Sequence, residues 1–160
     1  MALISKEMND AMNAQINEEL KSGYVYLGVS LWAEERSMHN YAAWMRKQIK
    51  EEYEHAERFM KYIIETGGHV ELKTIGQVPT KFPSTEATIK ITIEHEEFIT
   101  KKIRGLLELA YEKKEYEAID MLQWFVREQI EEEAQSNELM ATYELQGKKD
   151  GLWDHHLHRK

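Results

Sequence analysis

Apolar side chains recur every three or four residues along most of the chain, which is the pattern of amphipathic helices. The pattern predicts two long helices over about 5–36 and 40–66, and two more over about 85–113 and 116–146. A short fifth helix is expected over about 152–158, within the final segment GLWDHHLHRK. The predicted inner face of the first helix carries Met12, Ile16, Leu20, Leu27 and Leu31. The sequence therefore predicts an all-α fold.

A central stretch without helical periodicity separates the two pairs of helices. Gly67 and Gly68 predict a helix end there, and Ser84 or Thr85 is expected to cap the third helix. A helix of roughly 28 residues is about 42 Å long, so the short breaks SMHN and EKKEYE can only join antiparallel neighbours. The 17 residues from 68 to 84 can extend over roughly 56 Å. We therefore expect one domain over 1–160, a four-helix bundle with a long crossover between its second and third helices.

Composition narrows the chemistry that this bundle can carry. The chain has 29 acidic and 21 basic side chains, a formal charge of −8, and no cysteine. The missing cysteines exclude disulfides, thiolate catalysis and Cys-ligated metal sites. The acidic balance argues against nucleic acid or an anionic membrane as the main partner. The chain shows no secretion signal at its start and no apolar run near the roughly 20 residues that span a bilayer, so we expect a cytoplasmic protein.

Polar side chains interrupt the apolar faces of all four long helices. Glu52 takes the place of an apolar residue between Ile49 and Ala56, and His55 follows one turn later on the same face. The side chains in such positions are Glu19, Glu52, His55, Glu96, Gln129 and Glu132. Burying one unpaired carboxylate costs several kcal/mol of folding free energy. For a group of carboxylates, this cost is on the order of the whole free energy of unfolding of a domain. A bound cation is therefore expected among them.

The spacing of these residues indicates which kind of metal site they form. Glu19 and Glu52 are 33 residues apart, as are Glu96 and Gln129, so the two hairpins place polar groups at matching heights. Carboxylate-bridged di-iron bundles use a lone Glu from two helices and a Glu-x-x-His from each of the other two. The first hairpin has this full pattern, ending at His55, whereas the second offers Gln129 and Glu132. One imidazole among oxygen ligands suits iron, and the second half should hold its metal more loosely.

The segments INEELKSGYVYL, KEEYEHAERFM, IEHEEFITKKI and LQWFVREQIEEE resemble the haem-free ferritins of bacteria and archaea, in order and spacing, over nearly the whole chain. The resemblance implies a ferritin-like fold with a ferroxidase centre in each subunit. Fe(II) would be oxidised there by dioxygen or hydrogen peroxide. The resemblance also implies a hollow homo-oligomeric shell of two dozen subunits that stores the ferric mineral.

The resemblance also assigns roles to individual residues. It implies that Glu19, Glu52 and His55 bind the first iron, with Glu52 bridging, and that Glu96 binds the second. Gln129 would lie near the second iron and bond to oxygen species or water. An additional iron site is implied at Glu51, Glu128, Glu131 and Glu132. Tyr26 and Trp124 match aromatic residues beside the centre, and either could donate an electron, although packing is the simpler role for both.

Other features separate this chain from related classes. Bacterioferritins have a second Glu-x-x-His and a haem-binding Met where this chain has Tyr53, so no haem is expected. The absence of cysteine excludes a full-length rubrerythrin. Glu54 and Glu57 are expected on a solvated face, and His95 at the surface or an interface. The remaining histidines of interest, His155, His156 and His158, could bind metal at a symmetry axis or form a merely polar tail.

Two alternatives to iron storage stay open at this stage. The chain could be a soluble di-iron oxidase or peroxidase that acts on a small molecule without storage. It could also be an acidic helical bundle that binds no metal. A mass of several hundred kDa in solution would favour the cage.

Overall fold

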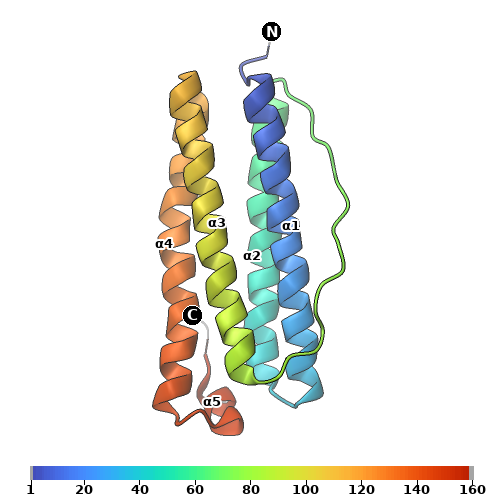
Figure 1. The fold of residues 1–160 in the computed structure, drawn as a ribbon, viewed down its shortest axis with the longest axis vertical. Helices are drawn as coiled ribbons and strands as arrows, with labels where there is room; N and C mark the ends of the chain where they lie inside the picture. The colour runs from blue at the N-terminus through green and yellow to red at the C-terminus, as the bar shows by residue number, and fades with distance from the viewer. Residues whose placement is uncertain (1, 159–160) are drawn as a thin grey trace.

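The computed structural model describes residues 2–158, and these residues form five helices and no strand. The four long helices are α1 (Lys6–Glu35), α2 (His39–Glu65), α3 (Thr85–Lys113) and α4 (Tyr116–Leu145). They form two antiparallel hairpins that pack side by side, and the crossover runs along the outside of α1 (Figure 1). The predicted four-helix bundle with a long crossover is confirmed.

The short helix α5 (Asp150–His156) lies across the end of the bundle at which α4 ends (Figure 1). It begins and ends two residues earlier than the sequence pattern predicts. Trp153 is buried and its Nε1 donates to Thr142 Oγ1. No side chain of its own segment caps α2, but the Asp154 carboxylate accepts from the Tyr41 backbone N–H at 2.8 Å. The helix α5 therefore caps α2 from a distance in sequence.

Helix ends follow the local sequence. Ser5 caps α1 by accepting from the Met8 backbone N–H, and Ser84, not Thr85, caps α3 by accepting from Ala87. After α2 and α4, Gly67 and Gly147 adopt positive φ angles of 85° and 68°. This left-handed conformation suits glycine and ends both helices.

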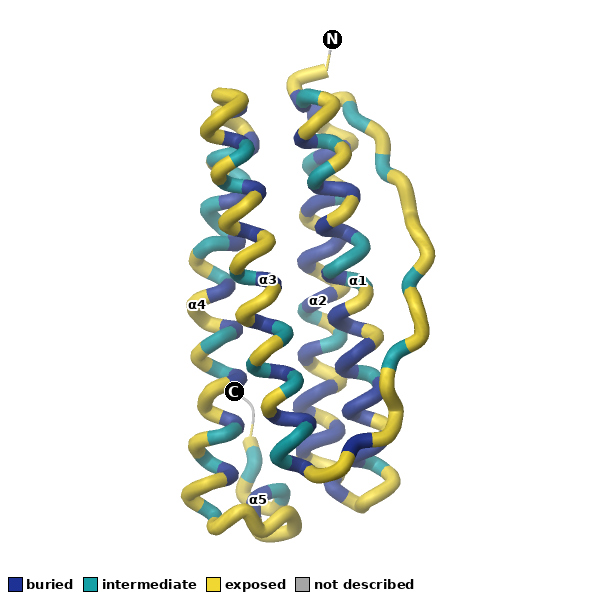
Figure 2. The backbone as a smooth tube through the Cα atoms, viewed as in Figure 1, coloured by how far each residue is buried: buried dark blue, intermediate teal, exposed yellow. Residues whose placement is uncertain are grey.

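Apolar packing is divided into two clusters along the bundle. One lies near α5 and contains Tyr26, Trp32, Tyr41 and Trp153 among others. The other lies toward the chain's N-terminus and contains Met12, Ile16, Phe59 and Phe125 among others. Buried positions follow the sides on which the helices face one another (Figure 2). On each long helix the predicted polar positions fall between the residues of the two clusters, so a polar layer crosses the middle of the bundle.

The inner face predicted for α1 is only partly correct. Leu31 is 47% exposed, and Leu20 and Leu27 are half-buried. The buried face instead combines large apolar residues, Val25, Tyr26, Val29 and Trp32, with small ones such as Ser22, Ser30 and Ala33. Small side chains let α1 approach α2 closely, and a pattern of large apolar residues cannot reveal them.

The crossover is held to α1 at both of its ends. The buried Asn13 accepts from the Glu71 backbone N–H at 2.7 Å and donates to the His69 carbonyl at 2.8 Å. Further along, the Pro79 carbonyl lies directly against Gly28, where a side chain would have no space. The crossover therefore follows a defined path despite having no secondary structure.

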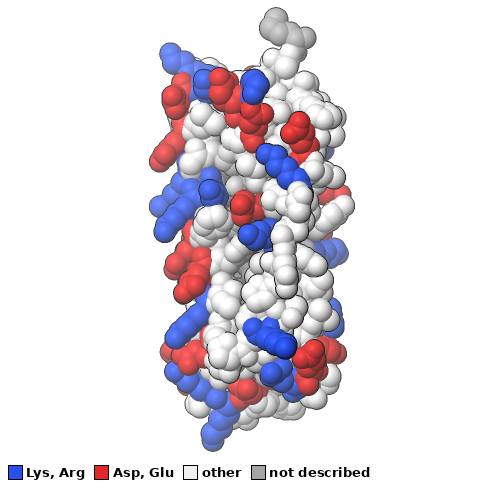
Figure 3. Space-filling model, turned by 45° about the vertical axis from the view of Figure 1, so that its right-hand side comes forward, with Lys and Arg blue, Asp and Glu red and all other residues white. Residues whose placement is uncertain are grey.

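Basic and acidic side chains are interspersed on the face drawn in Figure 3, with no region of a single sign. Within residues 2–158, no helix is long and apolar enough to cross a membrane.

Candidate metal centre

The structure brings the predicted polar residues together in the middle of the bundle. Glu19 comes from α1, Glu52 and His55 from α2, Glu96 from α3, and Gln129 and Glu132 from α4. None of these six residues is more than 3% exposed. Four helices thus contribute to one buried polar layer.

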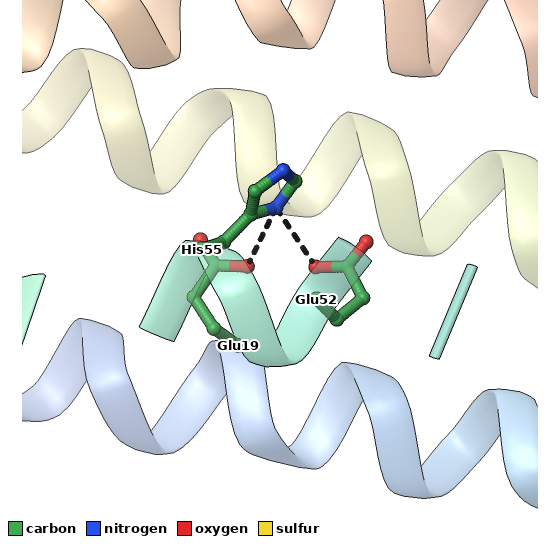
Figure 4. A group of neighbouring side chains, drawn as sticks. All are labelled: Glu19, Glu52 and His55. Atoms are coloured by element: carbon green, nitrogen blue, oxygen red, sulfur yellow. Dashed lines mark hydrogen bonds and ion pairs between the residues drawn. The ribbon is translucent and has the colours of Figure 1, made fainter. Parts of the chain in front are cut away.

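The first group consists of Glu19, Glu52 and His55 (Figure 4). His55 Nδ1 lies 3.3 Å from Glu52 Oε2 and 3.7 Å from Glu19 Oε2. One ligand atom from each residue lies within 4.8 Å of the others. Two carboxylates and an imidazole converging from two helices can hold a divalent cation.

Two further groups of potential ligands adjoin the first. Glu52, Glu96 and Glu132 form the second, and His55, Glu128 and Glu132 form the third, each within the same 4.8 Å limit. Three residues belong to two groups each, Glu52 to the first and second, His55 to the first and third, and Glu132 to the second and third. His55 Nε2 faces the third group, 3.6 Å from Glu128 Oε1 and 3.9 Å from Glu132 Oε1.

Burial changes the proton affinity of these groups. It raises the pKa of Glu52, Glu96 and Glu132, and repulsion from neighbouring carboxylates raises each pKa further, from Glu19 for Glu52, from Glu52 for Glu96, and from Glu96 and Glu52 for Glu132. For His55, burial lowers the pKa, but the surrounding carboxylates of Glu128, Glu19 and Glu52 outweigh burial and raise the pKa overall. Protons therefore compensate the carboxylates where no cation is bound.

One atom of the first group has no hydrogen-bond partner within the described chain. Glu19 Oε2 is buried and accepts no hydrogen bond, whereas Glu19 Oε1 accepts from Gln15 Nε2 at 3.0 Å. An orphaned buried carboxylate oxygen is costly unless a cation or water supplies the partner. The donor set thus fits a hard divalent cation.

Hydrogen bonds hold Glu96 from two sides. Tyr26 donates its hydroxyl to Glu96 Oε1 at 2.5 Å, and Gln129 Nε2 donates to Glu96 Oε2 at 3.3 Å. Burial followed by the charge of Glu96 raises the pKa of Tyr26 well above its usual value, so the phenol stays protonated. Tyr26 and Gln129 therefore lie at the second group, as the sequence predicts.

Sequence reasoning missed two glutamines that support the carboxylates. Gln48 Nε2 donates to Glu52 Oε1 at 2.9 Å and to Glu132 Oε2 at 2.7 Å. Gln15 supports Glu19 in the same way. Each glutamine precedes its glutamate by four residues, which places it one turn away on the same helix face. That spacing, with 33 residues between the two glutamines, was a signal available in the sequence.

Of the four glutamates expected to form an additional iron site, the structure brings only two into one ligand group. Glu128 and Glu132 join His55 in the third group. Glu51 lies with Glu128 in the wall of a surface pocket of about 550 Å³ beside His55. Glu131 is exposed, accepts from Gln135 Nε2 and lines a different pocket near α5. It is not part of any of the three groups.

His95, expected at the surface or an interface, lies between α3 and α1. It is half-buried, its Nε2 is 2.5 Å from Ser22 Oγ, and its ring packs edge-on against Tyr26 with centroids 5.7 Å apart. Because Ser22 is a small buried residue of α1, apolar periodicity gave no sign of this contact. Burial lowers the pKa of His95 to about 4.

The other residues singled out in the sequence lie partly beside the centre and partly at the surface. Trp124 packs edge-on against His55, with ring centroids 5.6 Å apart. The guanidinium carbon of Arg58 lies over the Trp124 ring, 3.6 Å from the ring centroid. Glu54 and Glu57 are exposed, as expected. Of the terminal histidines, His156 Nδ1 bonds to the Leu152 carbonyl within its own segment.

Two helix hairpins whose buried glutamates and histidine converge at mid-height define a carboxylate-rich metal-binding bundle of the kind that holds two metal ions. Comparison with known proteins identifies the family. The sequence model of the ferritin-like domain matches residues 9–145, so the chain belongs to the ferritin-like family.

Relatives and solved structures agree with this assignment. The bacterial non-heme ferritin of Campylobacter jejuni is 39% identical over 132 residues, which cover 82% of this chain and 79% of that protein. The bacterial non-heme ferritin of Escherichia coli is 31% identical over 152 residues, or 94% and 92% of the two chains. An open pore ferritin from the archaeon Archaeoglobus fulgidus superposes with a TM-score of 0.90 at 34% identity, covering 93% of this chain and 92% of that one.

Proposed function

We propose that this protein oxidises Fe(II) at a buried two-iron centre and stores the Fe(III) product inside a shell of its own copies. The observation that carries the proposal is the sharing of Glu52 between two adjacent ligand groups. A shared carboxylate can bridge two iron ions, so that both can deliver electrons to one oxidant molecule.

The ligands divide between the two ions. Glu19, Glu52 and His55 bind the first Fe(II), and Glu96, with Glu52 as the bridge, binds the second. Gln129 and Tyr26 hold Glu96 and stand beside the oxidant. Each Fe(II) gives up one electron and becomes Fe(III), and the two electrons, with two protons from solvent, reduce dioxygen to hydrogen peroxide or hydrogen peroxide to two water molecules. The hard carboxylate oxygens favour the ferric product.

The third group provides a route away from the centre. His55, Glu128 and Glu132 adjoin the surface pocket that Glu51 lines. We assign the additional iron site to Glu51, Glu128 and Glu132, with Glu131 completing it after a change of rotamer. An acidic site on the path to the surface draws iron out of the centre toward the store.

Storage requires a closed assembly. The relatives named ferritin support a homo-oligomeric shell, which we propose has two dozen subunits and works in the cytoplasm without haem. The alternative, a soluble di-iron oxidase or peroxidase without storage, is disfavoured because the similarity to those relatives spans most of the chain.

The test combines assembly with activity. Size exclusion should give a mass of several hundred kDa, and aerobic addition of Fe(II) should raise the near-ultraviolet absorbance of ferric oxide. The double variant Glu52→Ala and His55→Ala should oxidise iron far more slowly than the unmodified protein. Its matched control is Glu54→Ala with Glu57→Ala, which changes two exposed residues of the same helix. Equal rates in the two double variants would refute the proposed ligands.

A further inference from the structure

Gln129 is anchored on α3 by a chain of hydrogen bonds that extends beyond the metal centre. Its Nε2 donates to Thr100 Oγ1 at 3.1 Å as well as to Glu96. Thr100 Oγ1 in turn donates to Glu133 Oε2 at 2.5 Å. Thr100 and Glu133 are 33 residues apart, the same interval that separates Glu96 from Gln129, so the two pairs lie one turn apart between α3 and α4.

The count of hydrogen atoms in this chain determines how the amide is oriented. A threonine hydroxyl has one hydrogen to donate and two lone pairs that accept. The Thr100 hydroxyl has two acceptors, the Glu133 carboxylate at 2.5 Å and the Glu96 backbone carbonyl at 3.0 Å, and the shorter, charge-assisted bond to Glu133 takes its hydrogen. Thr100 can therefore only accept from Gln129, and the nitrogen end of the amide must face it.

The other end of the amide is thereby assigned as well. Both Nε2 hydrogens of Gln129 point toward α3, to Thr100 and to Glu96. The carbonyl oxygen Oε1 is left as the atom that Gln129 can present to a cation held by Glu96. A carbonyl oxygen is a favourable neighbour for a hard cation, whereas an NH₂ group repels it.

We propose that Thr100 and Glu133 are positioning residues that fix the Gln129 amide with its oxygen available to the second metal ion. Without the Glu133 acceptor, the Thr100 hydroxyl keeps only the Glu96 backbone carbonyl, at 3.0 Å, as an acceptor in its present setting, and a turned Gln129 Oε1 can compete with that carbonyl for the hydrogen. The amide can then turn over and present its NH₂ group to the cation. This inference rests on the proposed function, because it concerns the second of the two metal positions.

The test measures Co(II) binding, which needs no turnover and no oxidant. Visible absorption of Co(II) and equilibrium dialysis give the affinity of each equivalent per subunit. In the Glu133→Leu variant, the second Co(II) should bind about 10- to 100-fold more weakly, the usual effect of removing a hydrogen-bond partner behind a metal site. The first Co(II) should bind as in the unmodified protein. Glu133→Gln, which keeps an acceptor oxygen, should restore the second affinity.

A second pair of variants applies the same test to Thr100. Thr100→Val removes the hydroxyl and should weaken the second Co(II), whereas Thr100→Ser should not. Thr92→Val is the matched control, because Thr92 is a buried threonine of α3 whose hydroxyl donates one turn back to the Thr88 carbonyl and interacts with Tyr41, neither of which is a proposed metal ligand. If Glu133→Leu fails to assemble, the Thr100 pair decides the question.

The outcomes separate this inference from the proposed function. Fewer than two Co(II) per subunit in the unmodified protein would refute the two-metal centre itself. Two Co(II) in the unmodified protein with no change in Glu133→Leu and Thr100→Val would overturn only the positioning role. Equal weakening of both equivalents, or no rescue by Glu133→Gln and Thr100→Ser, would also overturn it, since those results indicate general structural damage.

Discussion

The metal-free protein should lose stability as the pH rises from 5 to 8. A carboxyl whose pKa is higher in the folded than in the unfolded chain keeps its proton longer when folded. Its stabilising contribution is complete below the unfolded pKa and is lost as the pH rises through the folded pKa. Glu52, Glu96 and Glu132 all have raised pKa values, and so does His55, which acts in the same direction.

The size of the effect follows from the smallest of the three carboxyl shifts. Burial, with repulsion from Glu19, raises the pKa of Glu52 from 4.5 to about 7. At about 1.4 kcal/mol per pH unit, this one group removes about 3 kcal/mol between pH 4.5 and 7. For a chain of this length, 1 kcal/mol corresponds to about 2–4 °C in the melting midpoint. The midpoint should therefore fall by about 6–12 °C.

The assay is thermal unfolding followed by circular dichroism in chelator-treated buffer at four pH values. Saturating Zn(II), which is redox-inert, should reverse the trend because the cation replaces the protons. Glu132→Gln removes one buried carboxylate and should flatten the pH dependence, while Glu131→Gln, an exposed neighbour, is the control. A midpoint that stays constant or rises from pH 5 to 8, or equal slopes in the two variants, would refute the reasoning.

Three further predictions test individual contacts. Tyr26→Phe removes the hydroxyl that bonds to Glu96 and should slow iron oxidation several-fold, measured by stopped-flow absorbance, without changing assembly. An unchanged rate would leave the phenol with a packing role only. Asp154→Ala removes the cap of α2 and should cost about 1 kcal/mol, with faster amide exchange at the start of that helix; unchanged exchange would contradict the capping role. Gly28→Ala forces the Pro79 carbonyl away and should destabilise the protein, whereas Gly23→Ala, whose added Cβ meets its nearest neighbour at 3.7 Å, should be tolerated; equal melting midpoints would count against the close crossover contact.

The fold was predictable because the polar residues of the centre keep strict helical spacing. Glu52 and His55 interrupt a regular apolar series, and this marks both the face that is buried and the height of the polar layer. The long crossover was predictable from its length alone. The segment 68–84 is long enough to run the height of the bundle, from the end of the second helix to the start of the third. The donor groups at Glu19, Glu52 and His55 follow from the same periodicity.

Other features could not be predicted, since they depend on contacts between helices. The Ser22 contact that buries His95 joins α1 to α3, and no local pattern connects the two residues. Glu131 belongs to the same acidic run as Glu132 in sequence, but its side chain accepts from Gln135 and lines a different pocket. The distant cap provided by Asp154 likewise depends on where α5 packs.

The distribution of the metal ligands between the two hairpins has a consequence for folding. Glu19, Glu52 and His55 all belong to the first hairpin, so that hairpin alone can assemble the first ligand group. The second group needs Glu96 and Glu132 from the other hairpin, which arrive only when the two hairpins dock. In the proposed two-metal centre, the first metal position therefore needs ligands from one hairpin only, whereas the second needs the complete bundle.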